Sequence, residues 1–196
     1  MPMSPRKYEK KARAASTDET RNRILAASLQ LHSDKGFAAT SWQDIADVAG
    51  VAVGTVYYHF PTLEDLVPAC STLARTLAPP PEATILDGVR GTNRRIEILV
   101  RALVAYYAGT QGGFRNALRE RNRIGVVNAL VAEIERNLVH LAREAIGRKP
   151  TDETAKEVEA ILDFRTWDAL QSRGLSQEVI VETVSSLVRA LISKRK

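Results

Sequence analysis

Cysteine is almost absent from this sequence of 196 residues, and so are the motifs that mark catalytic or metal sites. Cys70 is the single cysteine, so no disulfide can form within one chain, which fits a reducing compartment. Its apolar neighbours predict a buried structural thiol. No G-x-S-x-G, H-E-x-x-H, Walker or dinucleotide pattern occurs, and His59 has no histidine partner at i+4. The sequence therefore predicts neither an enzyme nor a bound cofactor or metal.

Long apolar runs are missing as well. No stretch approaches the roughly 18 apolar residues that span a membrane, and no apolar leader opens the chain, so a cytoplasmic protein is expected. Runs that alternate apolar and polar residues, as half-buried strands do, are also absent. Helical periodicity covers nearly the whole chain and predicts an all-α fold of about nine helices.

Charge is distributed unevenly along the chain. The formal net charge is +5, which favours partners that carry phosphate. The excess concentrates at the start, where Glu9 is the one acidic residue among five basic ones, namely Arg6, Lys7, Lys10, Lys11 and Arg13. Residues 1–17 are therefore predicted to form a basic, disordered tail, which is either an arm that contacts DNA or simply a solvated end.

Three consecutive prolines, Pro79 to Pro81, mark the clearest boundary, because proline supplies no amide donor and disfavours helical geometry. We place the domain division there, with residues 18–78 before it and residues 79–196 after it. The helices expected before the prolines begin near Thr17, at Ser41, at Ala52 and at Thr62. The helices expected after them cover about 92–108, 114–123 and 124–146, with one more capped by Thr151 and one by Ser176.

Residues 41–60 carry the most informative pattern, which is two short helices joined by a turn too short for an antiparallel pair. Ile45 and Ala49 are four residues apart and are expected to face inward. Val56 and Phe60 have the same spacing on the second helix. This arrangement is typical of a helix-turn-helix, which places its second helix in the major groove of DNA.

The outward-facing residues of this segment are the candidate DNA contacts. On the second helix they are Ala52, Val53, Gly54, Thr55, Tyr57, Tyr58 and His59, and at the start of the first helix they are Thr40, Ser41, Trp42 and Gln43. Their hydroxyl and imidazole groups can donate hydrogen bonds to phosphates or base edges. Gly54 costs roughly 1 kcal/mol in a helix relative to alanine, and close approach to the phosphate backbone would offset that cost. The alternative for Tyr57 is the core, and for Tyr58 it is packing on the following helix.

Residues 18–70 contain an ordered set of short motifs. They are Arg23-Ile24-Leu25-Ala26-Ala27, Gly36-Phe37, Thr40-Ser41, Asp44-Ile45-Ala46, Ala49-Gly50-Val51, Gly54-Thr55-Val56-Tyr57-Tyr58-His59-Phe60 and Glu64-Asp65-Leu66. This set resembles the DNA-binding signature of the TetR family. The resemblance implies an N-terminal three-helix helix-turn-helix domain, a C-terminal helical domain that binds ligand and dimerises, an Ω-shaped homodimer, and release from DNA when ligand binds.

The chain departs from the family pattern at a few positions. Serine or threonine followed by a basic residue is frequent at the start of the recognition helix, where this chain has Ala52 and Val53, and Leu63 replaces a frequent lysine. Two cations that would contact phosphates are therefore missing. One hypothesis is that the basic tail supplies part of this charge in the adjacent minor groove. Another is that Val53 contacts a thymine methyl group.

The second domain offers candidates for an effector pocket and for a dimer interface. The pocket candidates are Tyr106, Tyr107, Phe114, His140, Phe164 and Trp167, with ordinary core or interface packing as the alternative for each. Arginines at positions 115, 119, 121 and 123 either attract an anionic ligand or form a solvated face, which is the simpler interpretation. The apolar stripes of the last two helices are too broad for one buried face and predict a four-helix dimer interface.

These features together predict a DNA-binding repressor. A homodimer would place two recognition helices in successive major grooves of a palindromic operator in double-stranded DNA. An unidentified small-molecule effector would bind best to a conformer whose half-site spacing does not fit DNA, with the helix after the helix-turn-helix pivoting. The alternative function is that of a non-sensing architectural DNA binder, which would show little preference for sequence.

Overall fold

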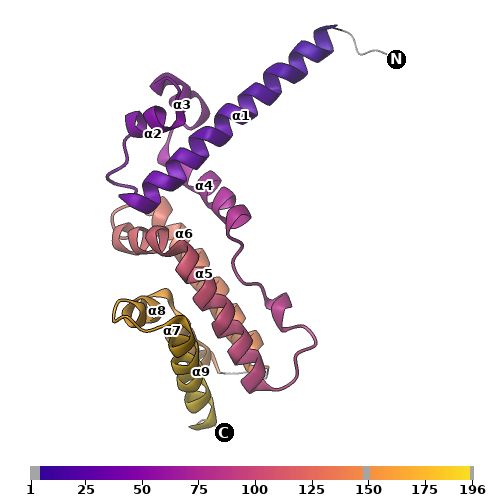
Figure 1. Ribbon diagram of the computed structural model, residues 1–196, viewed down its shortest axis with the longest axis vertical. Helices are drawn as coiled ribbons and strands as arrows, with labels where there is room; N and C mark the ends of the chain where they lie inside the picture. The colour runs from indigo at the N-terminus through magenta and orange to yellow at the C-terminus, as the bar shows by residue number, and fades with distance from the viewer. Residues whose placement is uncertain (1–4, 148–150, 195–196) are drawn as a thin grey trace. The chain divides into compact units, whose positions relative to one another are not determined.

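The computed structural model describes residues 5–147 and 151–194, with the side chains of residues 5–15 excepted. Within these residues there are nine α-helices, one short 3-10 helix and no strand, so the fold is all-α as predicted. The chain divides into two compact units, which Figure 1 shows in one view. The first unit comprises Met1–Leu77 and Arg115–Asn128, and the second comprises Ala78–Phe114 and Ala129–Lys196. The sequence pattern did not reveal that residues 115–128 group with the N-terminal unit.

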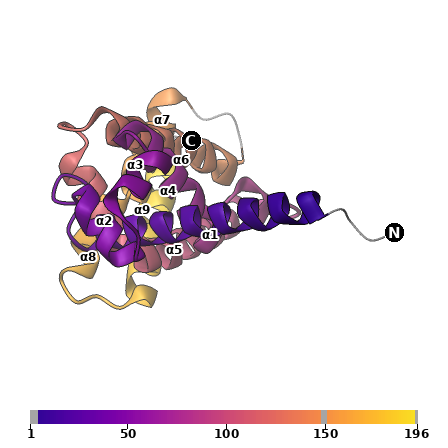
Figure 2. The ribbon, with the colours of Figure 1, turned by 90° about the horizontal axis from the view of Figure 1, so that it is seen from above.

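The first unit is built on α1 (Pro5–Asp34), α2 (Trp42–Ala49), α3 (Val53–His59) and α4 (Leu63–Leu77). The long helix α1, which Figure 2 shows uninterrupted, begins well before the predicted start near Thr17. Residues 5–17 are therefore helical and not the disordered tail that their composition suggested, while residues 1–4 lie outside the described part. Proline suits the first position of a helix, and no glycine or second proline follows before Gly36.

One buried cluster holds α1, α2, α3 and α4 together. Its members are Ile24, Leu25, Ala27, Ile45, Ala46, Ala49, Val56, Phe60, Leu66 and Cys70. The inward positions predicted for α2 and α3 are all among them. Gly50 then ends α2 in the left-handed conformation at φ 64° and donates its amide to carbonyls of the last turn, so the chain can reverse into α3.

The second unit contains the 3-10 helix η1 (Ala83–Leu86), α5 (Thr92–Glu120) up to Phe114, α6 (Gly125–Ile146) from Ala129, α7 (Asp152–Leu162), α8 (Phe164–Gln171) and α9 (Gln177–Lys194). Two predictions fail here. The segment 92–108 and most of the segment 114–123 belong to the single helix α5, which the glycines between them do not interrupt and which ends at Glu120. The helix capped by Thr151 divides at Asp163, whose carboxylate accepts the Arg165 amide at 2.7 Å and starts α8.

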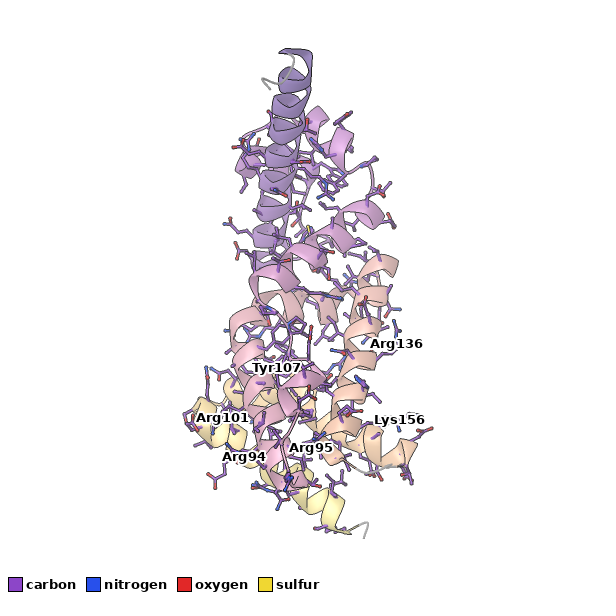
Figure 3. All side chains as sticks on the ribbon, turned by 90° about the vertical axis from the view of Figure 1, so that its right-hand side faces the viewer. Arg94, Arg95, Arg101, Tyr107, Arg136 and Lys156 are labelled. Carbon is purple, nitrogen blue, oxygen red and sulfur yellow. The ribbon has the colours of Figure 1, made fainter. Side chains whose placement is uncertain are left out.

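Arg95 joins three segments of the second unit, and Figure 3 labels it on α5 beside Arg94 and Arg101. Its guanidinium donates to the carbonyl of Glu144 in the last turn of α6 at 2.6 Å and 3.2 Å. It also donates to the carbonyls of Leu86 at 3.1 Å and Val89 at 3.3 Å. Because carbonyls at a helix end have no partner within the helix, this side chain completes α6 and fixes the segment after the prolines.

Candidate nucleic-acid interface

Local hydrogen bonds define where α2 begins. The hydroxyl of Ser41 accepts the Asp44 amide at 3.1 Å, and the Asp44 carboxylate accepts the Ser41 amide at 2.8 Å. This is the capping box predicted from the sequence. Helix α3 differs, because its first flanking residue, Ala52, has no side chain that can cap. The start of α3 thus has no cap from its own flanking side chain.

An ion pair neutralises the acidic group at the start of α2. The Lys35 ammonium lies 2.8 Å from a carboxylate oxygen of Asp44. Hydrogen bonds from Lys35 and then from Ser41 hold the pKa of Asp44 well below its usual range. The charge of Lys35 offsets a carboxylate that would otherwise repel a nearby phosphate. Sequence reasoning missed Lys35, because the two residues are joined across a turn and not by a helical spacing.

The second helix of the motif presents tyrosines to solvent. Tyr58 is 79% exposed and Tyr57 is 47% exposed, while Val56 and Phe60 are buried beneath them. Tyr57 therefore does not lie in the core, and the exposure of Tyr58 leaves little of it packed on the following helix. Val53 departs from its prediction, since it is half-buried and packs against the core cluster, so that only part of it is available to a thymine methyl.

The predicted contacts from α2 and α3 form one surface. The rings of Trp42 and Tyr57 have centroids 5.3 Å apart, which joins the start of α2 to the outer face of α3. Gln43 is exposed and donates to Asp47 at 2.7 Å, so its amide group is held in place. Thr40 is half-buried and donates its hydroxyl to the Gly36 carbonyl at 2.6 Å. Ser41, Ala52 and Gly54 are exposed, and Thr55 and His59 are half-buried.

Gly54 has no internal reason to be glycine. A Cβ atom placed on it would meet no heavy atom of the described residues within 4 Å, and its φ does not lie in the left-handed region. Neither packing nor backbone conformation therefore requires the missing side chain. The remaining reason for a glycine at position 54 is free space in front of the helix, which would let a ligand approach the backbone closely.

Other chemistry has little support in the described residues. No group of three or more histidine, cysteine, aspartate or glutamate side chains there is arranged to hold a metal ion. No helix in that part of the chain is long and apolar enough to cross a membrane. Burial raises the pKa of the Cys70 thiol to about 12, and the side chain is 4% exposed, so the thiol is structural as predicted.

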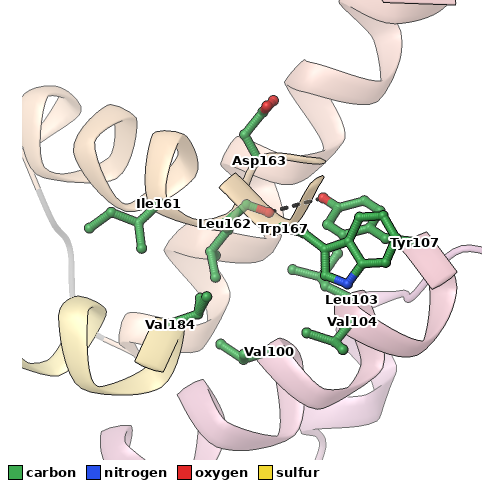
Figure 4. A pocket seen from close by; sticks show the side chains of 9 residues that line it. All are labelled: Val100, Leu103, Val104, Tyr107, Ile161, Leu162, Asp163, Trp167 and Val184. Carbon is green, nitrogen blue, oxygen red and sulfur yellow. Dashed lines mark hydrogen bonds between the residues drawn. The ribbon is translucent and has the colours of Figure 1, made fainter. Parts of the chain in front are cut away.

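A small cavity that is partly open to solvent lies in the second unit. Its volume is about 10 Å³, enough for roughly one water molecule. The lining residues, drawn in Figure 4, are Val100, Leu103, Val104, Tyr107, Ile161, Leu162, Asp163, Trp167 and Val184. The Tyr107 hydroxyl donates to the Leu162 carbonyl at 3.0 Å. Within the part of the chain that the structure describes, the buried Trp167 indole N–H has no hydrogen-bond partner, which leaves one donor unused at the cavity wall.

The structure gathers five of the six predicted pocket residues. Tyr107 and Trp167 line the cavity, and the rings of Tyr106, Phe114 and Phe164 contact them or one another, with centroids 4.8–6.0 Å apart. His140 was predicted wrongly. It is exposed on α6, where the following Leu141 and Ala142 face the core instead.

The predicted arginine run does not form one anion-binding face. Arg119 lies 2.8 Å from the carboxylate of Glu120, and the Arg121 Nε donates to the Asn128 side chain at 3.0 Å. Both side chains are thus engaged inside the first unit. Arg115 and Arg123 are exposed, which agrees better with a solvated face than with an anion-binding face.

Comparisons with known proteins agree with this geometry. Residues 24–70 match the family model described as bacterial regulatory proteins, tetR family. The HTH-type transcriptional repressor KstR of Rhodococcus jostii is 46% identical over 57 residues, which are 29% of this chain and 26% of that protein. This chain therefore matches about a quarter of that relative's length.

Solved structures match over most of the chain. A transcriptional regulator from Rhodococcus sp. RHA1 has a TM-score of 0.70 at 17% identity, with 89% of this chain and 96% of that chain covered. The multidrug binding protein EbrR, complexed with imidazole, has a TM-score of 0.62 at 24% identity, with 85% and 93% covered. These likenesses establish the fold of both units.

Proposed function

We propose that this chain is a transcriptional regulator of the TetR family that binds double-stranded DNA, and more specifically a repressor released by a small-molecule effector. The match of residues 24–70 to the family model and the shared fold support this proposal. One observation carries the DNA-binding proposal. Helix α3 exposes Gly54, Tyr57 and Tyr58 on one side and is held by buried Val56 and Phe60 on the other. This is the arrangement with which a recognition helix enters the major groove.

The test is the substitution Gly54→Ala, for which stability and function should change in opposite directions. Alanine favours a helix over glycine by as much as about 1 kcal/mol, and the new methyl group has room, so the free energy of unfolding should rise. DNA affinity should fall, because the methyl group occupies the space in front of the helix. The probe is a duplex that the wild-type protein selects from a randomised pool, with binding measured by fluorescence anisotropy.

Gly109→Ala is the matched control. Gly109 also lies in a helix, and a Cβ atom there would meet nothing within 4 Å, but it belongs to α5 in the second unit. This variant should gain stability and keep the DNA affinity of the wild type. If Gly54→Ala binds the selected duplex as tightly as Gly109→Ala does, α3 is not the surface that approaches DNA.

A homodimer is part of the proposal, because two recognition helices bind a palindromic operator in successive major grooves. Helix α9 supports it, since Val179 is 44% exposed and Leu187 is 49% exposed on the described chain, and a second copy would cover them. Leu187→Glu should dissociate the dimer in sedimentation velocity and weaken operator binding together. A wild-type protein that is monomeric at micromolar concentration would contradict this part.

Effector binding is proposed for the cavity of the second unit. Its lining is mostly apolar, and EbrR, which shares the fold, is a multidrug binding protein. Ligand pockets usually measure about 300–1,000 Å³, so a cavity of about 10 Å³ must widen before it holds an effector. This small volume is the observation that favours the alternative of a non-sensing architectural binder. A salt titration against the selected and a scrambled duplex separates the two, because an architectural protein binds both alike.

A further inference from the structure

The last turns of α5 hold the end of α1. The side-chain amide of Asn116 donates to the carbonyls of His32 and Ser33, both at 2.8 Å. These carbonyls belong to the last turn of α1, where no partner within the helix exists. Asn116 is 6% exposed and belongs to the first unit, as do both carbonyls. A side chain 83 positions away in sequence from Ser33 thus caps the helix that leads into the helix-turn-helix.

Glu120 holds the turn that follows. Its carboxylate accepts the Ala38 amide at 2.8 Å and also the Phe37 amide, and its other oxygen lies 2.8 Å from the Arg119 guanidinium. Burial alone would raise the pKa of Glu120, but these hydrogen bonds outweigh it, so the pKa lies below its usual range. A buried negative charge is therefore bound by two consecutive backbone amides of the turn, as anions are in backbone nests.

Gly36 shows how closely the carboxylate and the turn fit together. Its φ is +96°, a conformation that residues with side chains rarely adopt. A Cβ atom there would lie 2.2 Å from the Glu120 carboxylate and 2.8 Å from the Arg119 guanidinium. The glycine is required by two independent features of this turn, which indicates one fixed arrangement.

The turn at residues 36–38 leads directly to the surface that is proposed to face DNA. Thr40 donates its hydroxyl to the Gly36 carbonyl at 2.6 Å, and Ser41 is the cap of α2. We propose that Asn116 and Glu120 are positioning residues for DNA binding, which fix the turn at residues 36–38 and thereby place the start of α2 against the duplex. This inference rests on the proposed function. It assigns a role in DNA binding to residues far outside the helix-turn-helix.

The experiment compares Glu120→Ala, Glu120→Gln and Asn116→Ala with the wild type. Glu97→Gln is the matched control, because Glu97 is a partly exposed glutamate on the same helix that pairs with Arg94. Affinity is measured by fluorescence anisotropy for a duplex that the wild type selects from a random pool and for a scrambled duplex. We expect Glu120→Ala and Asn116→Ala to bind the selected duplex about tenfold more weakly, because the turn must then be ordered on binding.

Affinity for the scrambled duplex should change by less than about twofold, since non-specific binding rests on charge more than on exact placement. Glu120→Gln keeps the shape and one acceptor oxygen, so it should recover part of the loss. Hydrogen exchange of the 36–41 segment provides a second measurement, in which the Phe37 and Ala38 amides should exchange faster in Glu120→Ala. Should that variant fail to fold, Glu120→Gln and Asn116→Ala carry both measurements.

The outcomes separate this inference from the proposed function. A wild-type protein that selects no duplex refutes the proposed function. If the wild type selects a duplex and the folded Glu120 and Asn116 variants bind that duplex as tightly as Glu97→Gln does, only the positioning role is refuted. Equal losses on selected and scrambled duplexes also refute it, because they would reflect a general loss of the folded protein.

Discussion

A buried histidine should make the stability of this protein depend on pH above the range where carboxylates titrate. His32 is 3% exposed and stacks on Phe37 with ring centroids 4.4 Å apart. Its Nδ1 atom is buried and has no hydrogen-bond partner among the described residues. Burial lowers the pKa of His32 to about 4, although the charge of Glu120 opposes this shift. The folded protein therefore keeps His32 neutral where the unfolded chain would protonate it.

The sign and size of the effect follow from the two pKa values. The unfolded chain binds a proton at His32 below about pH 6.5, whereas the folded chain does not until about pH 4. The free energy of unfolding is therefore not reduced by His32 above about pH 6.5, and it falls as the pH drops from there toward about 4. Between pH 7 and pH 5 the loss is about 2 kcal/mol, a large share of a typical stability of roughly 5–15 kcal/mol.

Urea denaturation at pH 7, 6 and 5, at one fixed protein concentration, measures this loss. His32→Phe retains a ring that can stack on Phe37 and removes the titration. Between pH 7 and pH 5 its free energy of unfolding should therefore fall by about 2 kcal/mol less than that of the wild type. His32→Leu repeats the test with a different shape. His140→Gln is the control for the loss of a histidine, because His140 is exposed on α6. Parallel slopes for wild type and both His32 variants would refute the reasoning.

Three further predictions concern the first unit. Ser41→Ala removes the cap of α2 and should lower the free energy of unfolding by about 1 kcal/mol in urea denaturation, and no change would mean that solvent replaces the cap. Cys70 should not react with a thiol reagent in the folded protein but should titrate as one equivalent in urea, so rapid reaction of the native protein would contradict its burial. Deletion of residues 1–16 should make DNA affinity less dependent on salt. The slope of log affinity against log salt concentration should fall in magnitude by about 0.9 for each phosphate that this basic segment neutralises. Unchanged affinity and slope would exclude the segment from the interface.

Local signals in the sequence predicted the helix-turn-helix well. The capping box of Ser41 and Asp44 spans three residues, and the inward pair Ile45 and Ala49 spans four, so each interaction is complete within one short stretch. The glycine at position 50 adopts the left-handed conformation that ends α2. Interactions of this kind depend on nearest neighbours along the helix, which is why a pattern reveals them.

Interactions between distant segments were not predictable in the same way. The hydrogen bond between Glu120 and Ala38 joins residues 82 positions apart, and no spacing rule points to it. The aromatic character of Tyr107, Phe114 and Trp167 suggested a cluster, but aromatic character alone placed His140 there as well. Whether a helical residue faces the core depends on which stripe its neighbours bury, and that is decided by tertiary packing.

Helix α5 contributes to both units. Its residues Val100, Leu103 and Val104 line the cavity of the second unit. Further along the helix, Asn116 and Glu120 form hydrogen bonds with the end of α1 and with the turn before α2. Because one helix carries both groups of side chains, a substitution that breaks α5 should disturb the cavity of the second unit and the turn before α2 in the same variant.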